Sequence, residues 1–262
     1  MADLDVLAPG DHICWAVDAD DDFELTAKRC LVEGSRVGDK VLYVGPAASL
    51  PGSPLSAVAV KAFDPGPALT GPAGVDDMLQ VFRLEATSAT DDGFRALRVV
   101  ADMDWMAGLA TNDELTAFEL RLDAVADEVG AVVICAYRAT TFPAGEVARV
   151  NTVHSQTFGQ PDDLGFRVCS DGPQCWDVTG EVDCFNAEAF GLVLASAASS
   201  GTVRVRLDRL EFIDVAGMRA IAAAAEAGAV ARMSLESPSE TFARCWALLG
   251  YEALAPKVEL VR

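Results

Sequence analysis

The sequence is poor in basic residues. Its 262 residues include 20 lysines and arginines against 40 aspartates and glutamates, so its formal net charge is −20. Affinity for DNA depends largely on Lys and Arg side chains that neutralise phosphates, so a chain this acidic repels nucleic acids and anionic lipid surfaces. We therefore expect no direct nucleic-acid binding and no membrane binding. A protein with a basic face is the more natural partner.

Long apolar runs and paired cysteines are also missing. No apolar stretch approaches the roughly 20 residues that span a bilayer, and residues 1–10 lack the basic and apolar regions of a signal peptide. The seven cysteines are odd in number and show no C-x-x-C spacing, which indicates neither a disulfide framework nor a zinc ribbon. We expect a cytoplasmic protein whose cysteines are mostly buried, reduced thiols.

A phosphate-binding loop is absent as well. No G-x-x-x-x-G-K-[ST] motif occurs in the chain, and the loop AVDADDDF at residues 16–23 has no Gly or Lys. Its four carboxylates satisfy the dipole of the following helix and repel a triphosphate. Because no nucleophile–base pair is legible either, we expect a non-enzymatic protein without a cofactor.

What the first half contains is an α/β pattern. Apolar strands are predicted at residues 12–17, 40–44, 57–63, 97–101 and 131–137, with residues 45–74 otherwise assigned to loops. One amphipathic helix is predicted from Phe23 to Glu33, ended by Gly34, and another from Thr111 or Asn112 to Gly130. Strands with little alternation between amphipathic helices indicate a parallel sheet covered on both faces.

The second half repeats the α/β pattern with other spacings. The chain turns polar around residues 158–163, and we divide it there into domains of residues 1–160 and 161–262. Strands are predicted at residues 175–179, 202–207 and 233–235. Helices are predicted to begin at Asn186, near Asp214 and at Ser237, where a capping Ser precedes Pro238 and Glu240.

Several fragments of the first half, taken in order, resemble the MEDS domain, a sensory domain named for methanogens and methylotrophs. They are GDHIC (10–14), EG (33–34) leading to KVLYV (40–44), LRV (97–99) followed by DMDW (102–105), FELRL (118–122), CAYR (135–138) with FP (142–143), and His154. The resemblance implies a degenerate RecA-like parallel sheet sandwiched by helices. It also implies that the domain senses a small effector such as a hydrocarbon derivative.

Ligands of open α/β sheets bind at the carboxyl ends of the strands. We therefore expect the effector near Trp15, residues 102–105 and residues 137–138. The candidate effector-binding residues are His12, Cys14, Trp15, Asp102, Asp104, Trp105, Glu119, Cys135, Tyr137 and Arg138. Asp102 and Asp104 also fit a role as turn and cap residues. Glu119 either pairs with an arginine such as Arg98 or Arg138 or lines the pocket.

The spacing His12-x-Cys14 puts both side chains on one face of a strand. With Cys135 on another buried strand, they suggest a metal or haem site in a redox or metal sensor. The simpler interpretation is a histidine satisfied by one hydrogen bond beside packed cysteines. We favour this interpretation and expect no bound metal.

The second half resembles a STAS domain, the fold of anti-sigma-factor antagonists, through VTGEVD (178–183), NAE (186–188), LD (207–208), Leu210 and FIDVAG (212–217). The resemblance implies a smaller α/β domain that binds an anti-sigma factor or a related kinase-like regulator. A homodimer is a further candidate assembly. The candidate partner-binding residues are Asp183, Asp208, Asp214, Val215, Ala216, Gly217 and Met218.

The phosphorylatable serine of the STAS family is replaced here. In members under phosphorylation control a Ser precedes the motif's Gly, whereas this chain has Ala216, with Val215 before it. Neither residue has a hydroxyl group, so this site accepts no phosphate. Asp214 is expected to cap the next helix, a role compatible with contact to a partner. We therefore expect partner switching controlled by the attached sensory domain.

Overall fold

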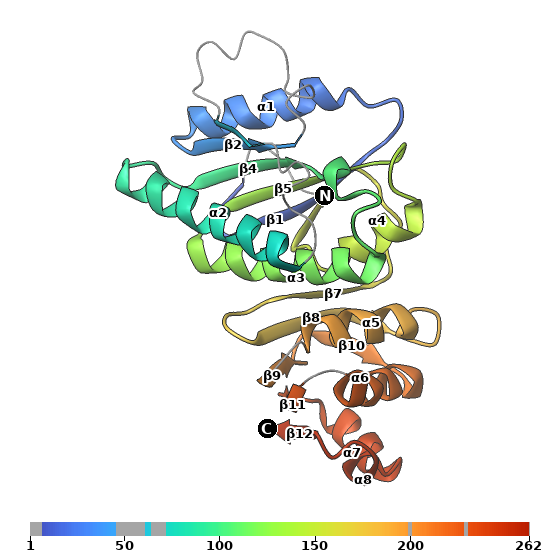
Figure 1. Ribbon diagram of the computed structural model, residues 1–262. Helices are drawn as coiled ribbons and strands as arrows, with labels where there is room; N and C mark the ends of the chain where they lie inside the picture. The colour runs from blue at the N-terminus through green and yellow to red at the C-terminus, as the bar shows by residue number, and fades with distance from the viewer. Residues whose placement is uncertain (1–6, 46–60, 64–71, 199–200, 228–229, 262) are drawn as a thin grey trace. The chain divides into compact units, whose positions relative to one another are not determined.

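The computed structural model describes residues 7–45, 61–63, 72–198, 201–227 and 230–261 (Figure 1). They form two compact units, and the main division between these falls after Asp162. Two short earlier stretches, Asn112–Leu120 and Ala148–Val153, group with the second unit. Both units are α/β, as the sequence predicts. Within the described residues, no helix has the length and apolar character needed to cross a bilayer.

The first unit is built on a parallel six-stranded sheet with the strand order β3-β2-β4-β5-β1-β6. The strands are β1 (His12–Val17), β2 (Lys40–Val44), β3 (Lys61–Phe63), β4 (Leu97–Asp102), β5 (Val132–Arg138) and β6 (Gln156–Phe158). β1 and β4 are buried at every position, and β5 at all but its last. Burial on both faces explains why these strands are apolar without alternation.

Helices cover both faces of this sheet. They are α1 (Phe23–Arg36), α2 (Pro72–Asp91), the 3₁₀ helix η2 (Met103–Met106), α3 (Asn112–Val129) and α4 (Ala144–Asn151). α1 lies on one face, and α2 and α3 lie on the other (Figure 1). Successive residues of β1 therefore meet different environments. Ile13, Trp15 and Val17 pack into the cluster that includes α1, whereas His12 and Cys14 point to the opposite face.

The sequence prediction missed α2. We expected loops up to residue 74 and assigned no element to the segment after it. Buried Met78, Leu79, Phe82, Ala86 and Ala89 recur at helical spacings and could have identified it. The strand predicted at residues 57–63 corresponds to β3 at its end, and residues 57–60 lie outside the described residues.

α1 begins where the sequence predicts but continues further. The Asp22 carboxylate caps it by accepting a hydrogen bond from the backbone N–H of Leu25 at 2.9 Å. Gly34, predicted to end the helix, lies inside it. The helix ends at Arg36, and Gly38 follows with φ of +90°. Gly34 instead serves close packing, because a Cβ atom there would lie 2.5 Å from Cδ of Arg98.

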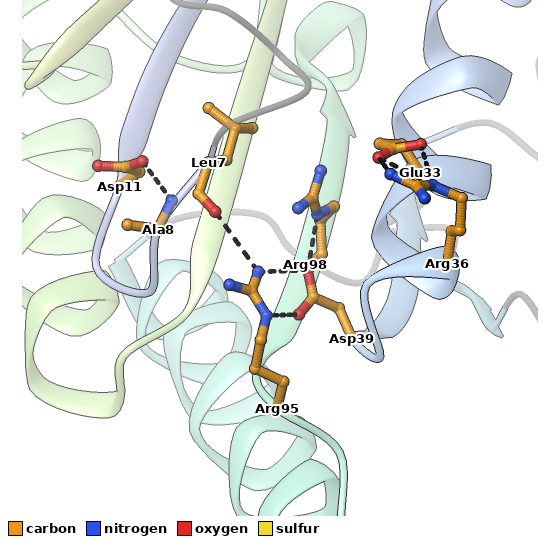
Figure 2. Close-up of polar contacts among 8 residues, drawn as sticks. All are labelled: Leu7, Ala8, Asp11, Glu33, Arg36, Asp39, Arg95 and Arg98. Atoms are coloured by element: carbon orange, nitrogen blue, oxygen red, sulfur yellow. Dashed lines mark hydrogen bonds and ion pairs between the residues drawn. The ribbon is translucent and has the colours of Figure 1, made fainter.

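A buried ion pair holds Arg98 at this position. Figure 2 shows the Asp39 carboxylate between two guanidinium groups: Arg98 Nε donates at 2.9 Å and Arg95 Nε at 2.7 Å. The Arg95 guanidinium also donates to the carbonyl oxygen of Leu7, which ties the chain before β1 to the start of β4. Asp39 and Arg98 are both buried. Removing one partner of such a pair leaves an uncompensated buried charge, which is strongly destabilising.

The second unit has a sheet of strand order β10-β8-β9-β11-β12, with β7 antiparallel to β8 and the other pairs parallel. Its strands are β7 (Phe166–Ser170), β8 (Cys175–Val182), β9 (Gly201–Arg206), β10 (Leu210–Ile213), β11 (Val230–Glu236) and β12 (Val258–Val261). Its helices are α5 (Ala187–Ala197), α6 (Val215–Ala227), α7 (Glu240–Leu248) and α8 (Tyr251–Leu254). β9 confirms the strand predicted at residues 202–207, and burial alternates along it: Val203 and Val205 are buried and Arg204 is exposed.

Two helix starts of the second unit differ in detail from the prediction. Asn186 precedes α5, but its side-chain amide donates to the carbonyls of Leu164 and Glu181, at 2.7 and 2.9 Å, and makes no cap bond. The Asn186 side chain therefore links the segments around Leu164 and Glu181 and does not cap α5. α7 begins later than predicted, and its cap is Ser239 rather than Ser237, with the Ser239 hydroxyl accepting from Phe242 N–H at 3.1 Å.

Replacing Gly34 by alanine should destabilise the chain by about 1–3 kcal/mol, because the added methyl group displaces Arg98 from Asp39 in a packed interior. Gly145→Ala is the matched control: Gly145 is also helical, and no heavy atom lies within 4 Å of its added Cβ. That variant should be neutral or up to about 1 kcal/mol more stable. Urea unfolding of the full chain measures both, and equal effects of the two variants would contradict the prediction.

Candidate functional site

The chain changes direction across the first sheet at the carboxyl ends of β1 and β5. From β1 it passes through α1 to β2, which lies on the β5 side of β1; from β5 it passes through α4 to β6, on the opposite side of β1. Two connections that run in opposite directions leave a crevice outside the carboxyl ends of the strands. Ligands of open α/β sheets bind in this position.

A cavity of about 230 Å³ lies at this edge. Its walls come from the ends of β1 and β5, the start of α4 and the segment after β6, and include Val17, Asp18, Tyr137, Phe142, Val147 and Gln160. Drug-sized ligands occupy pockets of about 300–1,000 Å³, so this cavity suits a smaller molecule. Tyr137 and Phe142 meet edge to face, with ring centroids 5.1 Å apart, and form an aromatic wall.

The neighbouring part of the same edge is closed by an ion cluster. Arg138 donates to Asp102 at 2.6 Å and to Asp104 at 2.8 Å, and its guanidinium lies 4.1 Å from the ring centre of Phe23. Burial raises the pKa of Asp102, while the Arg138 charge opposes that rise. Asp102 also caps η2 by accepting from Asp104 N–H at 3.3 Å, so the predicted cap role is confirmed. Both carboxylates thus form ion pairs with Arg138 and are not among the residues that line the cavity.

The loop after β1 uses its carboxylates as acceptors for its own backbone N–H groups. Asp22 accepts the N–H group at the start of α1, and Asp21 accepts from Asp18 N–H at 3.0 Å. The orphan N–H groups of a helix start are what bind phosphate in nucleotide folds. Here side-chain carboxylates take that place, as the sequence predicts.

A separate group of buried side chains lies on the α3 side of the sheet. His12 of β1, Cys135 of β5 and His154, just before β6, are each 0% exposed. One potential ligand atom from each of them, and one from the carboxylate of Glu119, all lie within 4.8 Å of one another. α3 is one unbroken helix, so Glu119 sits one turn before Asp123 on the same side of it.

The orientation of His12 is fixed from both sides. Its Nδ1 lies 3.1 Å from a carboxylate oxygen of Asp123, and its Nε2 lies 3.5 Å from Sγ of Cys135. The His12 and His154 rings are adjacent, with centroids 3.9 Å apart. Tyr137 meets His154 edge to face at 6.2 Å and also lines the cavity. The buried group and the cavity are therefore neighbours.

The predicted effector residues thus fall into different places. His12, Glu119 and Cys135 are brought together, and Tyr137 lines the cavity. Cys14 is opposite Cys135 in the strand register and is buried, but it does not belong to the group of four. Other candidates lie elsewhere: Trp15 stacks on Phe23 at 5.3 Å on the α1 face, Asp102 and Asp104 hold Arg138, and Trp105 is half-buried in η2.

His154 and Asp123 are not among the site residues predicted from the sequence, and Glu119 was predicted either to pair with an arginine or to line the pocket. The arginines proposed as partners of Glu119 hold other carboxylates: Arg98 pairs with Asp39 and Arg138 with Asp102 and Asp104. The spacing of Glu119 and Asp123, four residues apart in a helix, was a signal that could have joined them. Nothing in the sequence pairs His154 with His12.

In the second unit, the start of α6 is capped as predicted. Asp214 accepts a hydrogen bond from Gly217 N–H at 3.0 Å. Gly217 is buried, and a Cβ there would lie 2.6 Å from Ile213 and 2.8 Å from Val182. Met218 is buried as well. Both residues hold the helix start in position, whereas Val215 is 55% exposed.

The remaining candidates of this unit stabilise turns. The Asp183 carboxylate accepts from Phe185 N–H at 2.8 Å, and Asp208 lies 3.5 Å from Nε of Arg206. Between α5 and α6 runs a groove of about 590 Å³ whose lining includes Cys184 and Ala216. The residues that follow Cys184 and precede Ala216 in the sequence, Phe185 and Val215, are exposed, Phe185 by 94%. Ala216 therefore lies in an apolar surface region.

Comparisons with known proteins give one family and two weak structural likenesses. Among solved structures, the chain resembles the Bacillus cell fate determinant SpoIIAA in its phosphorylated form, with 22% identity, a TM-score of 0.25, and coverage of 37% of this chain and 91% of that one. It also resembles EccC (ATPases 2 and 3) of Thermomonospora curvata in complex with a signal sequence peptide. There the identity is 11% and the TM-score 0.30, with coverage of 97% of this chain and 76% of that one. Both TM-scores are too low to establish a common fold.

No curated protein matches the chain. The model of the MEDS family, described as the MEthanogen/methylotroph, DcmR Sensory domain, matches residues 11–155. The match covers more than half of the 262 residues. It includes the cavity walls from β1 and β5 and all four members of the buried group. The chain belongs to the MEDS family.

Proposed function

We propose that the chain is a non-enzymatic signalling regulator, in which the MEDS domain binds a small effector and the second unit binds a protein partner. The observation that carries the proposal is the small cavity at the switch point of the first sheet. It lies where ligands of open α/β sheets bind. A sensory domain with such a cavity needs no catalytic group.

The effector should be small and mostly apolar. Aliphatic and aromatic side chains form much of the cavity wall, and Asp18, Gln160 and Asp162 supply polar groups. The carboxylates disfavour an anion and accept a hydrogen bond from a hydroxyl or amine. A short hydrocarbon derivative with one polar group has this chemistry and fits a volume of about 230 Å³.

The partner surface is proposed at the start of α6 and the adjoining groove. Exposed Phe185 and Val215 offer apolar anchors, and an exposed apolar patch commonly marks a binding surface. The chain's charge of −20 favours a partner with a basic face. An anti-sigma factor or a related kinase-like regulator is the class that the STAS resemblance implies. Because Ala216 has no hydroxyl, we assign control to the effector.

The local contacts support the absence of nucleotide hydrolysis. Asp22 takes the helix start that would bind phosphate, and Asp102 is held by Arg138 rather than directed to a metal-bound nucleotide. A signalling protein of this kind acts by stoichiometric binding and has no turnover.

Narrowing the cavity should abolish effector binding. Ala144 lines the cavity at the exposed start of α4, so Ala144→Phe fills space without loss of core packing. A thermal-shift series with short alcohols, amines and halogenated hydrocarbons should stabilise the parent chain and not this variant. Glu146→Phe places the same ring on the same helix at a residue not assigned to the lining, and should respond like the parent. If the ligands stabilised both variants equally, the cavity would not be the effector site.

A charge at the start of α6 should weaken partner binding by at least about tenfold, since it introduces a buried charge into an apolar contact. The test uses the full chain as bait in lysate of its source organism, with Val215→Asp compared to the parent. Leu254→Asp is the matched control, because Leu254 is 69% exposed on α8 of the same unit. The parent and control should capture an anti-sigma or kinase-like regulator. Capture that is lost only in the control would refute the assigned surface.

The purified protein should hydrolyse neither ATP nor GTP above the background of a mock preparation. Phosphate release measures this directly, with Asp102→Ala as the diagnostic variant. Turnover that persists through purification and disappears in Asp102→Ala would show that the proposed non-enzymatic role is wrong.

A further inference from the structure

We propose that His12, Glu119, Cys135 and His154 bind one divalent transition-metal ion, and that Zn²⁺ is the ion that suits them best. The site lies in the interior of the MEDS domain and is distinct from the effector cavity. It therefore goes beyond the proposed function and does not depend on it. The donors are two imidazoles, one thiolate and one carboxylate, which is the set that zinc prefers in proteins.

The spacing of the donor atoms fits a tetrahedral ion. Zinc binds sulfur at about 2.3 Å and imidazole nitrogen at about 2.0–2.1 Å, so these two atoms are about 3.6 Å apart when both bind one ion. The observed distance from Cys135 Sγ to His12 Nε2 is 3.5 Å. The widest separation in the group, up to 4.8 Å, exceeds a tetrahedral edge by about 1 Å and requires a modest side-chain rotation on binding.

Burial and charge point to a cation. All four side chains are 0% exposed. An ionised carboxylate or thiolate in such an interior is strongly disfavoured unless an opposite charge compensates it. One thiolate and one carboxylate among the donors carry two negative charges, which a divalent ion balances. Soft thiolate and imidazole donors also select against Mg²⁺ and Ca²⁺, which prefer oxygen ligands.

Asp123 acts as a positioning residue for His12. Its carboxylate lies 3.1 Å from Nδ1 of His12 and favours the tautomer with the proton on that nitrogen, in which Nε2 is the nitrogen that would bind the ion. The Nε2 atom is the one that faces Cys135. Metal-binding histidines are almost always held by such a carboxylate or carbonyl partner, and loss of that partner typically weakens binding by about 10–100-fold.

Four protein donors leave no open position on a tetrahedral ion. Closed sites of this kind stabilise structure, whereas catalytic zinc keeps a position for water or substrate. The ion would join β1, β5, α3 and the chain entering β6, which meet at this point. Through Tyr137, which contacts His154 and lines the cavity, the occupied site would also hold one cavity wall in place.

The test is a Co²⁺ titration of the whole 262-residue chain after removal of metals by dialysis against a chelator under reducing conditions. Co²⁺ replaces Zn²⁺ in tetrahedral sites and gives visible bands together with a near-ultraviolet thiolate-to-metal band. We expect saturation at about one equivalent and loss of the spectrum on addition of Zn²⁺. Zn²⁺ should also raise the melting temperature, because it binds the folded state.

The variants separate the ligands from their surroundings. Cys135→Ser should abolish the thiolate band and weaken Zn²⁺ binding by at least about 100-fold, and Asp123→Asn should keep the band but weaken binding by about 10–100-fold. Cys14→Ser is the matched control, since Cys14 is a buried thiol directly opposite Cys135 in the register. It should retain both band and affinity. If Cys135→Ser does not fold, as judged by circular dichroism, Glu119→Gln replaces it and should show the same loss of affinity.

A folded parent protein that takes up less than about a tenth of an equivalent of Zn²⁺ or Co²⁺ would overturn the site. So would a thiolate band that survives in Cys135→Ser or depends on Cys14. These outcomes leave the effector and partner proposals intact, because Ala144→Phe and Val215→Asp alter neither a donor atom nor its support. Conversely, failure of partner capture would leave the metal measurement unaffected.

Discussion

The parallel pairing of β1 with β5 is the constraint on which the first unit depends. It sets His12 opposite Val133 and Cys14 opposite Cys135, so that alternate residues of both strands point to the same side. A slip of one residue would turn every side chain of β1 to the other face. The register therefore decides that His12 and Cys135 share the α3 side, while Trp15 joins the core beneath α1.

The two faces of this sheet have different chemistry as a result. On the α1 side, mostly apolar side chains pack together, and the buried Arg98 is neutralised by Asp39 at the amino end of β2. On the α3 side, His12, Cys135 and His154 form a buried group, and the cavity opens at the carboxyl edge. The apolar face supplies stability, because burial of apolar surface is the main favourable term in folding. The polar face is where a ligand can bind.

The positions of the charged side chains explain why we propose that this sheet binds a small effector and not a nucleotide. A nucleotide site needs exposed N–H groups at the start of the first helix and a free acid at the end of a strand. Here the Asp22 carboxylate accepts a hydrogen bond from the N–H group of Leu25 at the start of α1, and Arg138 forms an ion pair with Asp102. Both groups therefore have partners within the protein. At the same edge of the sheet, the place we propose for a ligand is the small and largely apolar cavity. In the second unit, the cap of Asp214 fixes the start of α6 and leaves Val215 on the surface.

The sequence by itself determined the α/β class, five of the six described strands of the first unit, three of the six in the second and the acidic loop before α1, since these follow from local periodicity and local capping. It also identified Asp214 and Asp102 as caps, because a cap acts within three residues. It failed where distant segments decide. Gly34 looks like a helix end until Arg98 is seen beneath it, and Asn186 looks like a cap until its amide is seen to hold Leu164. Only the tertiary structure joined His154 and Asp123 to His12, because strand order and register bring together residues more than a hundred positions apart.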